Sequence, residues 1–342
     1  MVPRSARAAA GCAALVYLCL AGSLAGQQAA ENRDTPTKIS IVSKVVTLPV
    51  TVRDKHGKIV SDLTPTDFTL QEDGRPQSIK YFEQVVDMPL VIGLLVDTSL
   101  SQKNVLDEEK VASGVFLDDM LKPDRDNAFL IHFDFEVELL QDLTSSTEEL
   151  RRGLVELEMP SQESMRQRRH ITGGTLLYDA VYLASHDLMQ RKKGRKALIL
   201  LTDGGENGSK EGLEQAVEAA QRADTVVYSI LFADDHPSLG FGGGRRGRRG
   251  GGWPGVGFPS GLIDGKRILE RISRETGGRM YEVSKNQTID KIYADIAEEL
   301  RTQYNMGYTP DKESGPGYHK VTLAAKPKDL KVQTREGYYA ER

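Results

Sequence analysis

Short apolar runs alternate with amphipathic stretches through the middle of the chain. The runs, which we predict to be strands, cover residues 90–96, 128–133, 197–201 and 226–232, with a shorter one at 280–283. Helices are predicted over residues 103–121, 175–190, 211–223, 264–276 and 288–302. Near-continuous apolar strands are typical of parallel sheets that are covered on both faces. Residues 89–302 therefore predict an α/β domain with a doubly wound, mostly parallel sheet, and residues 137–141 predict a hairpin partner at its edge.

The flanking segments have the alternating pattern of half-buried strands. Val46, Leu48, Val50 and Val52 open this pattern, and further strands are predicted at 68–70, 79–81, 304–308, 321–325 and 332–334. Neither flank has enough strands for a core of its own, because isolated hairpins are only marginally stable. We therefore predict that residues 44–88 and 303–342 pack together as a small β-sandwich, into which the α/β domain is inserted.

The first 43 residues have the pattern of an export signal and a leader. Arg4 and Arg7 precede an apolar run over 8–21, and small residues follow, which predicts a secretory signal peptide over 1–25 and a flexible leader over 26–43. The alternative is a signal that is kept as a membrane anchor. Both cysteines, Cys12 and Cys19, lie in this signal, so its removal would exclude thiol catalysis, disulfides and cysteine-ligated zinc. The protein is predicted to be exported, either periplasmic or secreted.

Composition and charge narrow the classes of partner. A formal net charge of −4 argues against nucleic acid as a partner. A glycine- and arginine-rich loop over 240–261 is either disordered or a contact for an anionic polymer or lipid, through Arg245, Arg246, Arg248 and Arg249. A second basic cluster, Arg166, Arg168 and Arg169, is either a solvated face or a surface that steers an acidic partner.

Oxygen-bearing side chains gather at the ends of two predicted strands. Asp97, Ser99 and Ser101 alternate directly after the first buried strand, and Asp203 follows the strand at 197–201. Thr175 closes a Thr-Gly-Gly-Thr sequence before a predicted helix. If the strand order reverses between the two strands, their loops face each other across the crevice where such sheets bind ligands. Carboxylate and hydroxyl oxygens suit a hard cation such as Mg²⁺.

These three pieces resemble the metal-ion-dependent adhesion site of von Willebrand factor type A domains. The resemblance covers residues 89–302 and implies that Asp97, Ser99, Ser101, Thr175 and Asp203 hold the metal. It also implies Mg²⁺, with Mn²⁺ and Ca²⁺ as alternatives, and an Asp or Glu of a protein partner that completes the coordination. The flanking Gly-Tyr-Thr-Pro at 307–310 and Gly-Tyr-Tyr at 337–339 are similar to sequences in exported bacterial proteins of this type, best described in Acidobacteria.

The predicted function is that of an exported binding or adhesion protein, not an enzyme. One alternative is a structural subunit of an envelope assembly in which the metal site is not essential. Another is a hydrolase, either metal-dependent or of the aspartic type, but no histidine adjoins the constellation and Asp203 lacks the threonine that follows Asp97. His132 is predicted to be a core residue whose hydrogen bonds are satisfied. Glu206 either faces water, which we expect, or lies in the surroundings of the metal. The oligomeric state stays open.

Overall fold

The computed structural model describes residues 45–84, 88–160, 174–232, 265–310 and 314–340. The predicted signal peptide, the leader, the basic cluster at 166–169 and the loop at 240–261 lie outside these residues. Within the described part, no helix is both long and apolar enough to span a membrane.

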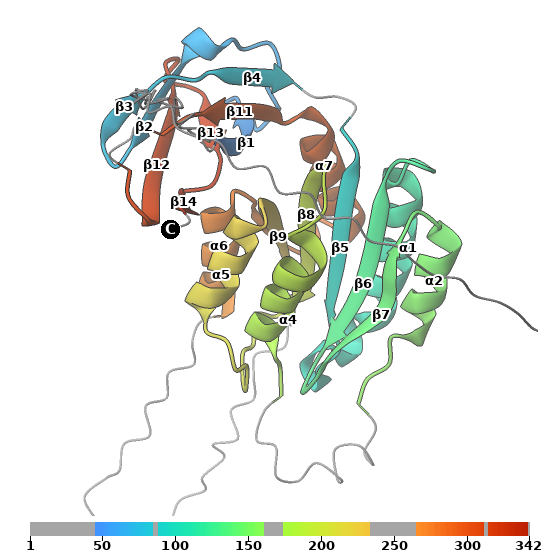
Figure 1. Cartoon of the computed structure of the whole chain (residues 1–342). Helices are drawn as coiled ribbons and strands as arrows, with labels where there is room; N and C mark the ends of the chain where they lie inside the picture. The colour runs from blue at the N-terminus through green and yellow to red at the C-terminus, as the bar shows by residue number, and fades with distance from the viewer. Residues whose placement is uncertain (1–44, 85–87, 161–173, 233–264, 311–313, 341–342) are drawn as a thin grey trace, which may run out of the picture. The chain divides into compact units, whose positions relative to one another are not determined.

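A six-stranded sheet with the order β10-β9-β8-β5-β6-β7 forms the centre of the α/β domain (Figure 1). Its strands are β5 (Leu90–Asp97), β6 (Asn127–Phe133), β7 (Val137–Thr144), β8 (Arg195–Thr202), β9 (Thr225–Leu231) and β10 (Met280–Glu282). All neighbours pair in parallel except β7, which runs antiparallel to β6 as an edge hairpin. Every residue of β5, β8 and β9 is buried, which explains their uninterrupted apolar runs.

Helices cover both faces of this sheet (Figure 1). One face carries α1 (Leu106–Met120), α2 (Thr147–Glu156) and α7 (Ile289–Thr302). The other carries α4 (Leu177–Leu183), with its π-helical continuation η3 (Ala184–Met189), α5 (Leu213–Arg222) and α6 (Gly265–Thr276). The predicted doubly wound architecture is therefore confirmed, and each face of the sheet has its own apolar core.

Three local features differ from the sequence predictions. The single strand predicted over 79–81 is replaced by two short strands, β3 (Arg75–Gln77) and β4 (Tyr81–Gln84). The helix predicted over 103–121 begins as a separate 3₁₀ turn, η2 (Leu100–Asn104), before α1. Helix α2 was not predicted, although its start carries a recognisable signal: Ser146 accepts a hydrogen bond from the backbone N–H of Glu149 at 3.3 Å. Only Leu150, Gly153 and Leu154 of α2 are buried, so its apolar stripe is too thin to stand out in the sequence.

The segments on either side of the α/β domain form two four-stranded antiparallel sheets. One has the order β13-β1-β11-β4 and the other β14-β12-β2-β3. The strands from the first segment are β1 (Val46–Arg53), β2 (Phe68–Glu72), β3 (Arg75–Gln77) and β4 (Tyr81–Gln84), with a 3₁₀ turn η1 (Pro65–Asp67) before β2. Those from the last segment are β11 (Tyr304–Tyr308), β12 (Gly317–Ala325), β13 (Lys331–Gln333) and β14 (Gly337–Ala340).

Both sheets combine strands from the two ends of the described chain. Leu48 of β1 pairs with Met306 of β11, and Leu70 of β2 pairs with Leu323 of β12. Apolar side chains of both sheets meet in a single core. This is the predicted sandwich, built from segments that could not form a core separately.

A buried carboxylate joins the sandwich to the α/β domain. Glu299 of α7 is fully buried, and its Oε2 accepts a hydrogen bond from Arg53 Nη2 of β1 at 2.6 Å. Its Oε1 accepts from Tyr228 Oη of β9 at 3.0 Å and from Gln333 Nε2 of β13 at 2.5 Å. Arg335 adds a second tie, because its guanidinium donates to Asp224 and to the backbone oxygen of Thr47.

We expect Glu299→Ala to lower the free energy of unfolding by about 3–5 kcal/mol, because the substitution removes the buried carboxylate that Arg53, Tyr228 and Gln333 share. Urea denaturation of the full chain measures this. Glu298, the exposed neighbour on α7, supplies the control: Glu298→Ala should change the free energy by no more than about 0.5 kcal/mol. Equal effects of the two substitutions would contradict the role given to Glu299.

Candidate metal centre

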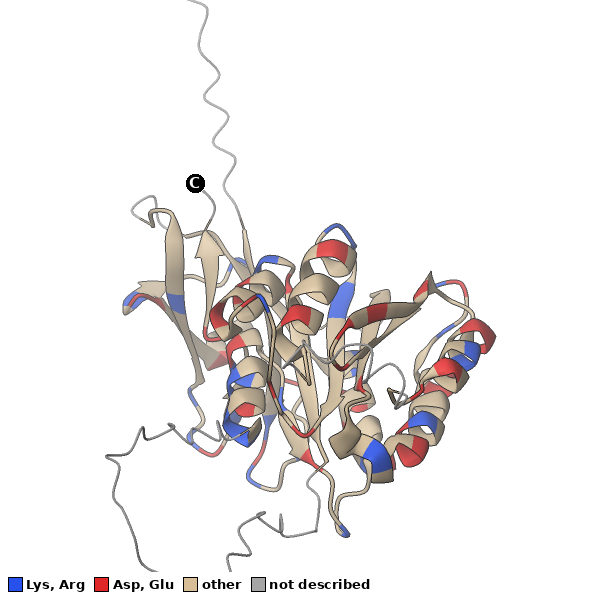
Figure 2. Cartoon of the chain, turned by 90° about the horizontal axis from the view of Figure 1, so that it is seen from below, with Lys and Arg blue, Asp and Glu red and all other residues tan. Residues whose placement is uncertain are grey.

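The strand order reverses at β5, next to β8. The chain leaves β5 toward α1 on one face of the sheet, and it leaves β8 toward α5 on the opposite face. The loops after these two strands therefore diverge and leave a crevice at the carboxyl ends of the strands. Asp97 is the last residue of β5, and Asp203 directly follows β8. Figure 2 looks onto this edge of the sheet, where acidic and basic residues are interspersed over the helices.

Asp97 is fixed by two neutral donors. Its Oδ1 accepts a hydrogen bond from the backbone N–H of Ser99 at 2.9 Å, and its Oδ2 accepts from Thr202 Oγ1 at 2.6 Å. The hydroxyls of Ser99 and Ser101 lie 2.9 Å apart. The oxygens of Asp97, Ser99 and Ser101 therefore lie close together. The hydrogen bond from Thr202 links the carboxyl end of β8 to that of β5.

Thr175 and Asp203 are brought together by a bridge between distant loops. The backbone N–H of Asn207 donates to Thr175 O at 2.9 Å, and Thr175 N–H donates to Asn207 O at 3.3 Å. A Cβ added at Gly205 would lie 3.0 Å from Asp203 Oδ1 and 4.0 Å from Thr175 Oγ1. Gly205 thus lies close to both oxygens, and a larger residue there would crowd Asp203.

Glu206 was predicted to face water, but its carboxylate is held by hydrogen bonds within the chain. Its Oε2 accepts hydrogen bonds from the backbone N–H of Tyr178 at 3.1 Å and from Ser209 Oγ at 2.9 Å. Asp179 of α4 in turn accepts from the backbone N–H of Glu211 at 2.9 Å. These bonds pin the loop after Asp203 against the first turn of α4, where unpaired backbone N–H groups attract carboxylates.

A second tie runs through Asp134, in the turn after β6. The backbone N–H of Leu176 donates to Asp134 O at 2.7 Å, and Thr98 Oγ1 donates to Asp134 Oδ2 at 3.3 Å. The Asp97 loop and the Thr175 loop are therefore both held by the β6 turn. The Nδ1 atom of His132 in β6 lies 3.1 Å from Thr98 Oγ1, so this histidine has a hydrogen-bond partner as predicted, but it is only partly buried.

Close backbone packing supports the Asp203 loop from behind. Gly204 has φ +80°, and a Cβ there would lie 2.6 Å from the backbone oxygen of Gly265, the first residue of α6. Only glycine fits both the positive φ and this distance. The start of α6 therefore fixes the Asp203 loop.

Negative charge accumulates in the crevice without a matching cation among the described contacts. Burial raises the pKa of Asp97 to about 6; hydrogen bonds from Ser99 and Thr202 act against this rise, and the charge of Asp203 adds to it. Glu109 of α1 is fully buried, and burial together with the charge of Asp97 raises its pKa to about 8. Neither carboxylate oxygen of Glu109 has a hydrogen-bond partner in the described part of the chain.

This donor set fits a hard divalent cation. It consists of two carboxylates and three hydroxyls, and the donors that hold Asp97 are neutral, so a bound cation would relieve the repulsion between the acidic groups. The sequence pattern named the five oxygen-bearing residues. It missed Thr202, Asp134, Asn207 and Glu109, and only Thr202, next to Asp203, carried a local signal.

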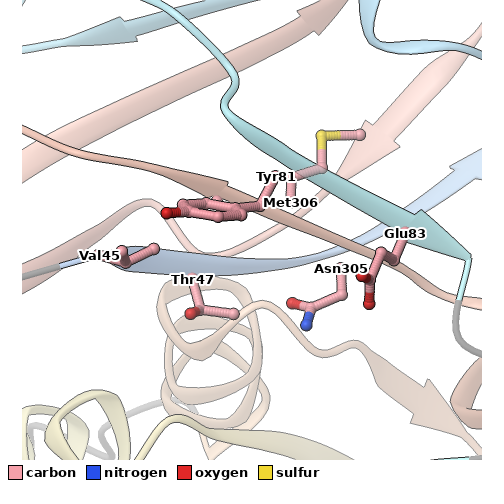
Figure 3. A pocket seen from close by; sticks show the side chains of 7 residues that line it. Val45, Thr47, Tyr81, Glu83, Asn305 and Met306 are labelled. Carbon is pink, nitrogen blue, oxygen red and sulfur yellow. The ribbon is translucent and has the colours of Figure 1, made fainter.

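A shallow hollow on the β-sandwich offers no comparable convergence of polar groups (Figure 3). Strands β1, β4 and β11 contribute its lining, which is Val45, Thr47, Tyr81, Glu83, Asn305, Met306 and Gly307. The ring of Tyr81 packs on Gly307, its partner in the sheet. A Cβ added at Gly307 would lie 3.0 Å from that ring. Glu83 alone is charged among these residues.

One protein family matches most of the α/β domain. The model of the von Willebrand factor type A domain matches residues 92–295. A search of curated protein sequences found no match. Among solved structures, the conserved hypothetical protein BatB from Bacteroides thetaiotaomicron is 18% identical and has a TM-score of 0.43, with 63% of this chain and 97% of that chain covered.

Two further structures give similar values. Proximal thread matrix protein 1 from the mussel byssus, with a zinc-occupied MIDAS motif, is 18% identical, with a TM-score of 0.45 and coverage of 68% of this chain and 50% of that one. The vWF domain of the type V pili tip protein Mfa5 from Porphyromonas gingivalis is 11% identical, with a TM-score of 0.43 and coverage of 63% and 96%.

The raised pKa of Glu109 predicts a pH dependence of stability. Between its ordinary pKa near 4.5 and the folded value of about 8, the folded protein holds one proton more than the unfolded chain. The free energy of unfolding should therefore fall as pH rises through this window, by about 1.4 kcal/mol per pH unit from this group.

Glu109→Gln should remove that contribution and flatten the profile between pH 6 and 8, measured by urea denaturation in a chelator. Asp119→Asn, at an exposed acid in the last turn of α1, is the control and should leave the slope unchanged. Parallel profiles for Glu109→Gln and the unmodified protein would contradict the prediction.

Proposed function

Because this chain belongs to the von Willebrand factor type A family, we propose that it is a binding protein whose α/β domain holds a divalent cation for a protein partner. Asp97, Ser99, Ser101, Thr175 and Asp203 would hold the ion, which would be Mg²⁺ or, alternatively, Mn²⁺ or Ca²⁺. The ion would supply a positive centre that attracts an Asp or Glu carboxylate of the partner. The residues of this chain would orient that centre and keep it at the open edge of the sheet.

The single observation that supports this proposal most strongly is the state of Asp97. Its carboxylate is fully buried, held by neutral donors, and close enough to Asp203 for that charge to raise its pKa. A buried anion without a charged partner is costly unless a cation joins it. A structural site would instead pair the anion internally, as Glu299 pairs with Arg53.

The surroundings of the site suit contact with a protein. Leu100, between the two serines, exposes 55% of its surface beside the proposed ion. Ser101 is exposed as well, whereas Asp97 is buried beneath it. We propose that the partner's carboxylate meets the ion from the side of Ser101 and that an apolar group of the partner packs on Leu100. The proposed location is outside the cytoplasm, either periplasmic or secreted.

The metal is tested by calorimetric titration of the chain over residues 26–342 with Mg²⁺ and Mn²⁺. We expect saturable binding that the double substitution Asp97→Asn/Asp203→Asn abolishes, because the amides keep the shape but lose the charge. Asp107→Asn, at an exposed acid in the first turn of α1, is the control and should bind normally. Undiminished binding by the double variant would place the ion elsewhere.

The partner chemistry is tested with immobilised peptides that contain Asp and Glu and with the same peptides carrying Asn and Gln. We expect capture of the acidic set in Mg²⁺ and its loss in a chelator. Leu100→Ser should weaken capture while leaving Mg²⁺ affinity unchanged, since Leu100 is proposed to touch the partner and not the ion. Capture that ignores the chelator would instead support the alternative of a structural subunit with a non-essential metal site.

A further inference from the structure

A second group of metal-ligating side chains lies in the β-sandwich, away from the crevice of the α/β domain. Glu72 ends β2, Asp73 follows it in the turn to β3, and His319 belongs to β12. One ligand atom from each residue lies within 4.8 Å of the other two. Nothing in the proposed adhesion function uses these residues.

The ring of His319 is oriented by a backbone carbonyl. Its Nε2 lies 2.7 Å from Gly315 O, and because a carbonyl oxygen only accepts, Nε2 must carry the hydrogen. Nδ1 then faces the carboxylates, 2.8 Å from Asp73 Oδ2 and 3.9 Å from Glu72 Oε1. The ring also stacks on Tyr338, with centroids 5.4 Å apart. Metal-bound histidines are commonly oriented through their other ring nitrogen in this way.

The turn that carries Asp73 is held in register with β12. Asp73 has φ +49° and is followed by Gly74 with φ +78°, which are the values of a tight hairpin turn. The backbone N–H of Lys320 donates to Asp73 Oδ1 at 2.9 Å, and Asp73 N–H donates to Lys320 O at 2.9 Å. The second carboxylate oxygen, Oδ2, is thereby aimed at His319.

The charges of this cluster call for a cation. With a neutral His319 and no cation, the lone pair of Nδ1 would face Asp73 Oδ2 at 2.8 Å with no hydrogen between them. Glu72 is fully buried, and its contacts with Ser314 and Tyr338 are with neutral hydroxyls. If His319 were protonated instead, the three groups, which include the buried Glu72, would carry a net charge of −1. A divalent ion would make them neutral, which lowers the cost of burial.

We propose that Glu72, Asp73 and His319 form a second divalent-cation site, of the type that binds Zn²⁺. One imidazole nitrogen and two carboxylate oxygens are established zinc donors, and a water molecule would take the remaining position. The ion would tie the β2–β3 turn of the first sandwich segment to β12 of the last one. Its role is therefore structural, and it does not depend on the proposed adhesion function.

The test measures Zn²⁺ binding by the full chain in competition with a chromophoric chelator. The Asp97→Asn/Asp203→Asn variant serves as the background, so that zinc at the first centre is not counted. We expect one equivalent of Zn²⁺ and a higher Tm with zinc than without it. Adding His319→Asn should abolish the equivalent and the zinc-dependent rise in Tm, since Nδ1 is the one nitrogen donor.

His186→Asn is the matched control. His186 also pairs with an aspartate, since its Nδ1 lies 2.7 Å from Asp187 Oδ1, but this pair is exposed. This variant should keep the zinc equivalent. If His319→Asn fails to fold, Glu72→Gln replaces it, and the visible spectrum of Co²⁺ added to the background protein reports directly whether nitrogen and oxygen donors bind.

Two results would overturn the proposal. The background variant could bind no Zn²⁺ and show no Co²⁺ spectrum, which would mean that only a proton occupies the cluster. Alternatively, His319→Asn or Glu72→Gln could retain the equivalent. Neither result bears on the first centre, because Mg²⁺ titration of the unmodified protein tests that centre separately.

Discussion

The position of β5 between β6 and β8 is the constraint on which the candidate metal centre depends. Chains leaving β5 and β8 turn to opposite faces of the sheet, so a crevice forms beyond their carboxyl ends. The same burial that makes β5 the centre of the sheet takes Asp97 away from water and raises its pKa to about 6. One topological feature thus provides both the place for a cation and the electrostatic reason for it.

Buried carboxylates in this protein differ in what neutralises them, and that difference separates those paired within the chain from those that we propose to bind an ion. Glu299 has the guanidinium of Arg53 and joins two parts of the fold. Asp97 has only neutral donors among its described hydrogen bonds, and so does Glu72 apart from the nearby imidazole of His319. The charge of Glu299 is therefore balanced within the chain. Asp97 and Glu72 lack such a partner, so a bound cation would lower the free-energy cost of burying them. Both proposed ion sites therefore include one of these two residues.

The β-sandwich is attached at the end of the sheet opposite the candidate metal centre. The ties through Glu299 and through Arg335 reach the end of α7 and the turn between α5 and β9, at the amino end of β9. Asp97 and Asp203 lie at the opposite, carboxyl ends of their strands. In Figure 1 the sandwich accordingly covers the upper end of the sheet, and the loops after β5 and β8 lie at the lower end. A partner could therefore reach the proposed ion without displacing the sandwich.

The sequence by itself determined what depends on local pattern. Uninterrupted apolar runs predicted the strands of the central sheet, and alternation after residue 303 predicted that the last segment would complete a sandwich with the first. Oxygen-bearing residues at strand ends predicted the loops of the candidate site. Helix α2 escaped because it buries too few residues to leave a stripe.

Tertiary structure alone decided which distant groups meet. The bond from Thr202 to Asp97 spans 105 residues, and the contact between Asp73 and His319 spans 246. Glu109 lies on a helix with an ordinary charged face, and only packing shows that its carboxylate is buried with no donor among the described residues. Periodicity records how each segment meets its own layer, whereas burial, loop contacts and pKa values depend on which layers and loops become neighbours when the chain folds.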